Sequence, residues 1–311
     1  MTERVVSQPV LKQITGGVYA WISANGDSNS GAVTTSEGLI AIDAQQSPAQ
    51  GRAFRTAIEA AAEQPVARLI NTHFHLDHTA GNIAFADVPI VAQERTPALM
   101  NEYMGTKNAR HWRVDQIDQR LRLFFGSNFD ELVPAQDPLH EWFTARVQRP
   151  GLEDLELIAP NETFSEQLTF DRTYGEIRLD YVGPAHCDGE MIIHLPKQKT
   201  AFLGDLMFVG RFPWLGDCFL HGWIECLAKI RSLDIDHVVP GHGDVSTLKE
   251  VDDFRVLLMS MLNAVKTKVT NGASEEAAMR EVALPQYASL PRYREWLPSN
   301  VRAIYHYLKQ G

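Results

Sequence analysis

The sequence has little cysteine, no long apolar run and no signal-like start, and each absence excludes a class of protein. Its 311 residues include three cysteines, too few for a disulfide framework, which predicts a reducing compartment and a cytoplasmic location. No segment approaches the roughly 20 apolar residues of a membrane span. The N-terminal residues carry no apolar stretch of signal-peptide length. We therefore expect no membrane partner.

Basic charge and two common catalytic motifs are also missing. The formal net charge is −10, which argues against a nucleic-acid partner because phosphate binding needs a basic surface. No Gly-x-Ser-x-Gly sequence is present to hold a nucleophilic serine, and no glycine-rich phosphate loop is evident. What remains is the composition of an ordinary globular protein.

One short segment concentrates metal-binding side chains. Residues 73–78 read His-Phe-His-Leu-Asp-His, so three imidazoles and one carboxylate lie within six residues. Such groups are costly to bury without a partner, and a divalent ion satisfies them together. His73 and His75 are two apart, so an extended backbone points them the same way, whereas Asp77 and His78 lie beyond a turn. The segment predicts a loop that holds two metal ions.

Three later segments carry further metal-binding side chains. His186 lies in a Gly-Pro-Ala-His-Cys-Asp-Gly segment, Asp205 follows a Phe-Leu-Gly run, and His242 stands between two glycines. Each segment follows or lies inside an apolar run that predicts a strand ending in a glycine-bearing loop. Four such segments in this order are far more specific than any one of them.

This pattern resembles the metallo-β-lactamase superfamily of metallohydrolases over about residues 17–245. The resemblance implies an α/β fold, a four-layer αββα sandwich with the metals at one edge. It implies seven ligands: His73, His75 and His186 for one ion, Asp77, His78 and His242 for the other, and Asp205 between them. An aspartate at the bridging position is similar to the glyoxalase II and lactonase branches.

Several further residues are assigned from their positions. Asp43 matches the aspartate usual near the end of an early strand in that family, and we expect it to orient a ligand histidine through the free ring N–H. Asp188 and Glu190 either do likewise or are solvated loop residues. A loop after Asp205 lies near the active-site mouth in this family, so three side chains there are predicted to contact substrate: Phe212, Trp214 and His221.

We expect a single domain over residues 1–311 with two helical additions. The interval from His78 to His186 is longer than two strands and a crossover need, and it is rich in aromatic residues. It predicts a helical insertion at about residues 98–148, which serves either as a lid and apolar substrate wall or as a homodimer surface or satellite core. A helical tail is expected at about residues 247–311, led by a long helix with one apolar stripe.

The ligand types suit zinc, two ions per chain, with manganese or iron as alternatives. Zinc lowers the pKa of bound water toward ~7, which supplies a metal-bridging hydroxide, and Asp77 is the predicted catalytic residue that helps move a proton to the leaving group. The sequence thus predicts a dinuclear zinc hydrolase of a thioester, lactone, ester or amide. The alternative is a mononuclear iron oxygenase acting on a persulfide. A non-catalytic binding protein would require a broken ligand set.

Overall fold

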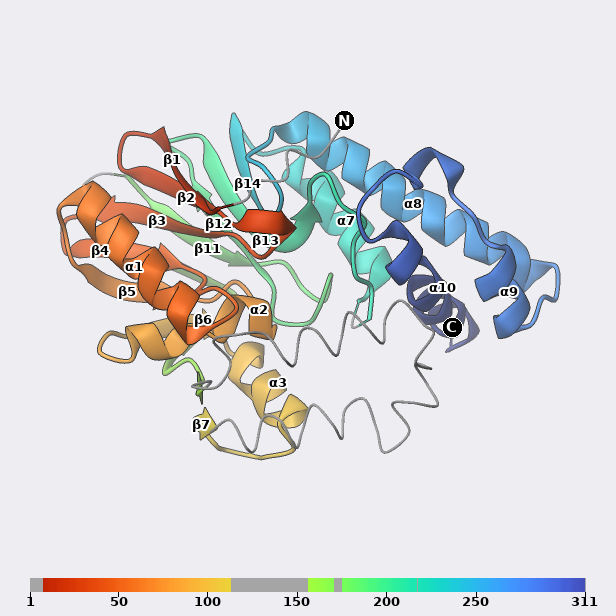
Figure 1. Cartoon of the computed structure of the whole chain (residues 1–311), viewed down its shortest axis with the longest axis horizontal. Helices are drawn as coiled ribbons and strands as arrows, with labels where there is room; N and C mark the ends of the chain where they lie inside the picture. The colour runs from red at the N-terminus through yellow and green to blue at the C-terminus, as the bar shows by residue number, and fades with distance from the viewer. Residues whose placement is uncertain (1–7, 113–155, 171–174, 217, 311) are drawn as a thin grey trace.

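Two β-sheets packed face to face form the centre of the molecule (Figure 1). The computed structural model describes residues 8–112, 156–170, 175–216 and 218–310. The larger sheet has the strand order β1-β2-β3-β4-β5-β6-β9. Its strands are β1 (Val10–Thr15), β2 (Val18–Ile22), β3 (Ser30–Thr35), β4 (Gly38–Ile42), β5 (Val66–Ile70), β6 (Ile90–Gln93) and β9 (Glu162–Phe164).

The smaller sheet has the order β10-β11-β12-β13-β14, and a separate pair joins β7 to β8. Its strands are β10 (Gln167–Phe170), β11 (Ile177–Tyr181), β12 (Met191–Leu195), β13 (Thr200–Phe208) and β14 (His237–His242), and the pair is β7 (His111–Trp112) and β8 (Leu157–Ile158). Strands β4, β5 and β6 run parallel to one another, and so do β13 and β14. Parallel neighbours end at the same edge, where such sheets usually place their sites.

Helices cover the outer face of each sheet. Helix α1 (Pro48–Ala62) lies on the larger sheet, while α7 (Leu220–Ile230) and α8 (Leu248–Thr270) lie beside the smaller one (Figure 1). The remaining helical segments are α2 (Leu76–Thr79), α3 (Arg95–Tyr103), α9 (Glu275–Glu281), α10 (Tyr293–Gln310), η1 (Ala24–Gly26), η2 (Asn82–Phe85) and η3 (Pro285–Tyr287). Helix, sheet, sheet and helix make four layers, so the expected αββα sandwich is confirmed.

Three buried clusters hold these layers together. Side chains such as Ile70 of β5 and Ile193 of β12 meet between the sheets. Phe54 of α1 packs on the larger sheet, and it is buried because apolar side chains three and four residues apart form one stripe. Trp223 of α7 and Leu258 of α8 pack on the smaller sheet, in a cluster that also contains α10 residues. Each sheet is therefore buried on both faces.

The two predicted additions are described in part. Helix α3 and strand β7 occupy the start of the predicted insertion, and residues 113–148 of that insertion lie outside the described residues. In the predicted tail, α8 begins after Thr247 and ends at Thr270, and α9 and α10 follow. Among the described residues, no helix combines the length and apolarity required to cross a membrane. The single-domain assignment stays a prediction.

Candidate metal centre

The predicted ligands come from strand ends and from the loops that follow them. The segment after β5 carries His73 and His75, and the expected loop then forms the short helix α2, which contains Asp77 and His78. His242 is the last residue of β14, parallel to β13. Asp205 lies inside β13, which runs past the strand expected from the sequence. His186 lies in the loop between β11 and β12.

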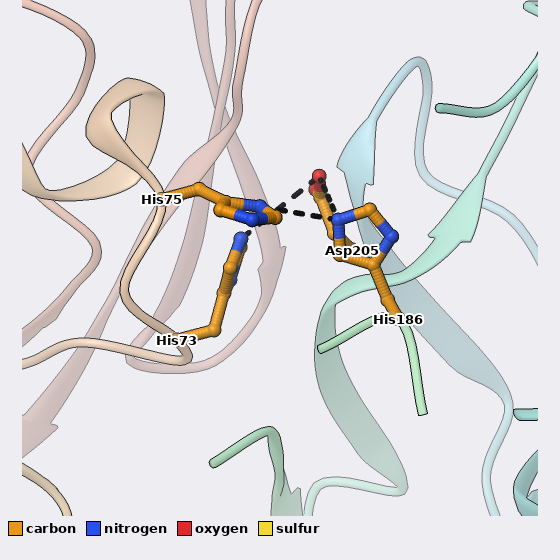
Figure 2. A group of neighbouring side chains, drawn as sticks. All are labelled: His73, His75, His186 and Asp205. Atoms are coloured by element: carbon orange, nitrogen blue, oxygen red, sulfur yellow. Dashed lines mark hydrogen bonds and ion pairs between the residues drawn. The ribbon is translucent and has the colours of Figure 1, made fainter. Parts of the chain in front are cut away.

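The first group of side chains contains His73, His75, His186 and Asp205, which point toward one another from the two sheets (Figure 2). Their potential ligand atoms all lie within 4.8 Å of one another. His75 Nδ1 is 3.2 Å from His186 Nε2, and His186 Nε2 is 3.4 Å from Asp205 Oδ2. His73 Nε2 is 4.0 Å from the same carboxylate oxygen. Three imidazoles and a carboxylate thus surround one point.

The second group contains Asp77, His78, His242 and again Asp205. His78 Nε2 lies 3.1 Å and His242 Nε2 lies 3.3 Å from Asp205 Oδ1, and Asp77 Oδ2 lies 3.4 Å from His242 Nε2. The two oxygens of Asp205 therefore face different groups, Oδ2 the first and Oδ1 the second. A Cβ atom at Gly241 would lie 2.0 Å from Asp205 Oδ1, so the close approach of β14 requires glycine there.

The residues present fit divalent metal ions. His73 Nε2, His78 Nε2 and Asp205 Oδ1 are buried and make no hydrogen bond among the described residues. Buried polar atoms are normally paired, so orphaned atoms converging from several elements call for a cation. The other ring nitrogen of two histidines is engaged: His78 Nδ1 lies 2.9 Å from Asp43 Oδ2, and His242 Nδ1 lies 3.0 Å from the Gly26 carbonyl. For His78 the carboxylate partner at Nδ1 leaves Nε2 as the acceptor that a metal needs.

The electrostatics of the groups favour bound cations. Burial alone would raise the pKa of Asp205, but His242 and His78 hold that pKa well below its usual range, so the carboxylate stays ionised. Burial lowers the pKa of His73 well below its usual range, and the neighbouring His78 and His75 add to this effect. Burial, and next the charge of Asp205, raise the pKa of Glu190 well above its usual range.

Asp43 contacts the ring nitrogen of His78 that faces away from the second group. It is 2% exposed and follows β4, where its backbone adopts a left-handed conformation with φ of 55°. Its Oδ1 accepts a hydrogen bond from the Thr72 backbone N–H, and its Oδ2 accepts one from the Thr72 hydroxyl and contacts His78 Nδ1. This is the contact that the resemblance implies for Asp43. Its role in orienting a ligand stays a proposal.

Several contacts of the ligand histidines were not predicted from the sequence. Arg211 donates to the Gly26 carbonyl, and its Nη1 lies 3.0 Å from His242 Nδ1. The Phe208 ring stacks on His242, with centroids 4.9 Å apart, and the Trp223 ring meets the edge of His186 at 5.0 Å. Phe208 follows Asp205 by three positions in one strand, which is a signal the sequence offered. Arg211 gave none, because a guanidinium beside a metal ligand has no local pattern.

The three predicted substrate contacts lie against the C-terminal helices. Phe212 has no exposed surface and packs against Tyr293, the first residue of α10. Trp214 packs against Trp296, and His221 lies beside Tyr307, also in α10. The structure does not bring these side chains into either metal group. Their predicted contact with substrate stays a prediction.

The loop that carries His186 holds two further acids of different character. Asp188 accepts hydrogen bonds of 2.7 Å from Arg95 Nε and from the Tyr181 hydroxyl, which links this loop to the start of α3. Glu190 is 1% exposed. Of the two possibilities open from the sequence, a solvated loop residue is excluded for Glu190.

Comparison with known families agrees with this geometry. A family model described as the metallo-beta-lactamase superfamily matches residues 24–242. A solved structure described as a metallo-beta-lactamase from Pontibacter korlensis superimposes with a TM-score of 0.58 at 21% identity, over 81% of this chain and 99% of that one. At that identity the structural match speaks for the fold alone.

Two relatives have longer chains. The 2,4-dinitroanisole O-demethylase subunit alpha of Nocardioides sp. (strain JS1661) is 26% identical over 233 residues, 74% of this chain and 54% of that protein. The linear primary-alkylsulfatase of Pseudomonas sp. (strain ATCC 19151) is 23% identical over 295 residues, 86% of this chain and 53% of that protein. The chain spans about half the length of these curated relatives.

Proposed function

The chain belongs to the metallo-beta-lactamase superfamily, and from that membership we propose that it is a dinuclear zinc hydrolase of a thioester, lactone, ester or amide. The observation that carries this proposal is the division of the Asp205 carboxylate, with one oxygen toward each group of histidines. A carboxylate shared in this way serves two neighbouring ions. In this proposal the seven predicted ligands hold both: His73, His75, His186, Asp77, His78, His242 and Asp205.

Two zinc ions held there would lower the pKa of a coordinated water toward ~7 and polarise the bond under attack. The residues of the chain do the rest. Thr72 and Asp43 fix the ring of His78, and the Gly26 carbonyl fixes that of His242, so that the ligand nitrogens are positioned before substrate arrives. Asp77 has a side chain 16% exposed, against 5% or less for Asp205 and His242, so it is the acid best placed to pass a proton to a leaving group.

The names of the relatives add a second candidate substrate class. One relative is named an alkylsulfatase and another an O-demethylase, so alkyl sulfate esters and aryl methyl ethers belong beside carbonyl substrates in any assay. All of these are small molecules that are cleaved at a bond to oxygen, sulfur or nitrogen. The cytoplasmic location and the homodimer remain predictions from the sequence.

The alternative of a single-iron persulfide oxygenase is less well supported. It needs only one metal group, and it leaves the second group, Asp77, His78 and His242, without a purpose. Burying those polar side chains costs free energy that a second ion offsets. Manganese or iron in both positions would still fit the hydrolase.

The first test is metal content by mass spectrometry on the full chain purified without chelators, followed by hydrolysis assays. We expect about two zinc ions per chain and turnover of at least one of the substrate classes above. One iron per chain, with oxygen consumed on a persulfide, would overturn the proposal.

A substitution tests the role of Asp77. We expect Asp77→Asn to lower kcat by roughly 10²-fold or more, because the amide can neither accept nor deliver the proton. The matched control is Asp87→Asn on the surface, where the carboxylate pairs with Arg55. If both variants turn over like the unmodified chain, Asp77 has no catalytic part.

A further inference from the structure

Glu190 is a buried acid that the proposed chemistry does not use. It directly precedes β12 and is 1% exposed, and neither of its carboxylate oxygens has a hydrogen-bond partner among the described residues. An unpaired buried carboxylate costs several kcal/mol unless a positive charge lies close to it. A group of this kind calls for an explanation, and one of its ion-pair contacts is with an atom of the metal centre.

That atom is Nδ1 of His73, which lies 3.6 Å from Glu190 Oε1. The same nitrogen lies 3.0 Å from the Thr72 hydroxyl, and that hydroxyl donates its own proton to Asp43 Oδ2. The hydroxyl oxygen is therefore an acceptor for His73, so Nδ1 carries the ring proton and Nε2 keeps its lone pair. Nε2 is the atom that faces Asp205 and the first metal group. Glu190 thus stands behind the protonated nitrogen of a ligand histidine.

The contact of Glu190 with His73 resembles the contact of Asp43 with His78. Asp43 stands behind Nδ1 of His78 in the second group, and Glu190 stands behind Nδ1 of His73 in the first. We propose that Glu190 is a positioning residue that strengthens metal binding by the group of His73, His75 and His186. This inference rests on the proposed dinuclear centre and adds a residue to it.

Charge balance supports the assignment. Four carboxylates lie in or directly behind the two groups, from Asp43, Asp77, Glu190 and Asp205. Two divalent ions would bring four positive charges to a centre that also contains the buried Arg211 guanidinium, so each of the four carboxylates offsets part of that charge. Without Glu190 the buried centre would hold an excess positive charge on the side of His73, and an excess charge in a dry interior weakens the binding of the ion that brings it.

The test compares zinc binding by the unmodified full chain and by Glu190→Gln, using zinc alone titrated against a competing chelator. We expect one of the two ions to bind about 10- to 100-fold more weakly in the variant, while the other changes much less. The thermal midpoint of the metal-free variant should not fall, because glutamine has nearly the same shape as glutamate and adds no charge to the buried position. Glu190→Asp keeps the charge and should recover part of the lost affinity. Glu225→Gln, an exposed position on α7, is the matched control.

The outcomes separate the two proposals. Two ions in the unmodified chain with unchanged zinc binding in Glu190→Gln would overturn the role of Glu190 alone. Equal losses of metal-free stability and zinc affinity in Glu190→Gln and Glu190→Asp would also overturn it, since they would mark Glu190 as a packing residue. Failure of the unmodified chain to bind two ions would overturn the proposed function together with this inference.

Discussion

Among single residues, Asp205 has the largest effect on the proposed centre because both metal groups use it. An amide cannot replace its carboxylate, because asparagine keeps one oxygen acceptor and has an N–H₂ donor in place of the other. The donor would point at an ion, and that contact is repulsive. The loss of negative charge also leaves the surrounding histidines without the partner that holds them together.

We therefore predict that Asp205→Asn loses at least one zinc ion per chain and that kcat/KM falls by roughly 10²-fold or more. Metal content by mass spectrometry and initial rates on the best substrate measure both effects. Asp234→Asn, which removes an exposed partner of Lys199, is the control for a surface Asp→Asn change. Full metal content and wild-type rates in Asp205→Asn would contradict the shared-carboxylate assignment.

The role of a residue could be predicted where several metal-binding side chains lie close together in the sequence. It could not be predicted where a single residue reaches the site only through the fold. The six-residue run from His73 to His78 cannot be explained by packing, so its role can be read from spacing alone. Arg211 contacts His242 only through the fold, from a position that carries no chemical signature in the sequence. The sequence allows Glu190 to be either a residue that orients a ligand or a solvated loop residue. Its burial distinguishes the two, and that burial depends on the packing around β12 rather than on its sequence neighbours.

At the scale of elements, two departures from the expected secondary structure both occur at the candidate site. The strand expected at residues 201–203 continues to Phe208, with Asp205 fully inside the sheet. A carboxylate in an apolar run normally ends a predicted strand, yet here it lies within the strand, between the imidazoles of both metal groups. The expected loop after His75 instead closes into the helical turn α2. Local propensity fails where functional groups override it.

Helix α8 offers a prediction about stability that is independent of the metals. Thr247 and Glu250 form a reciprocal capping box at its start, which satisfies backbone donors that the helix itself leaves open. We expect Thr247→Ala to reduce the free energy of unfolding by about 1 kcal/mol. The control is Thr270→Ala at the far end of the same helix, where the residue is exposed.

Chemical denaturation of both variants, with zinc present throughout, measures the difference. Zinc content should stay unchanged in Thr247→Ala because the Thr247 hydroxyl bonds to Glu250 and Lys249, neither of which is a predicted ligand. Equal midpoints for Thr247→Ala and Thr270→Ala would show that the capping contacts add nothing.

At the scale of the whole molecule, the two sheets meet along the edge that carries the ligands. The larger sheet delivers His73, His75, Asp77 and His78, whereas Asp205 and His242 come from the smaller sheet and His186 from a loop between its strands. Ions at this edge would therefore join the two halves of the sandwich. The general plan of the halves could be predicted from strand order and ligand order. Residues 113–148 of the predicted insertion lie outside the described residues.

Metal removal should consequently destabilise the whole chain rather than the site alone. An ion that binds only the folded state stabilises it by about 4 kcal/mol when its concentration is roughly 1,000 times its dissociation constant. We predict that a chelator lowers the thermal midpoint by several degrees and that added zinc raises it again in proportion to the logarithm of zinc concentration. Asp205→Asn should respond much less, because its sites are already impaired. A midpoint that chelation leaves unchanged in the unmodified chain, with two ions measured beforehand, would mean that the ions do not join the halves, and the ligands would then have to be preformed by packing alone.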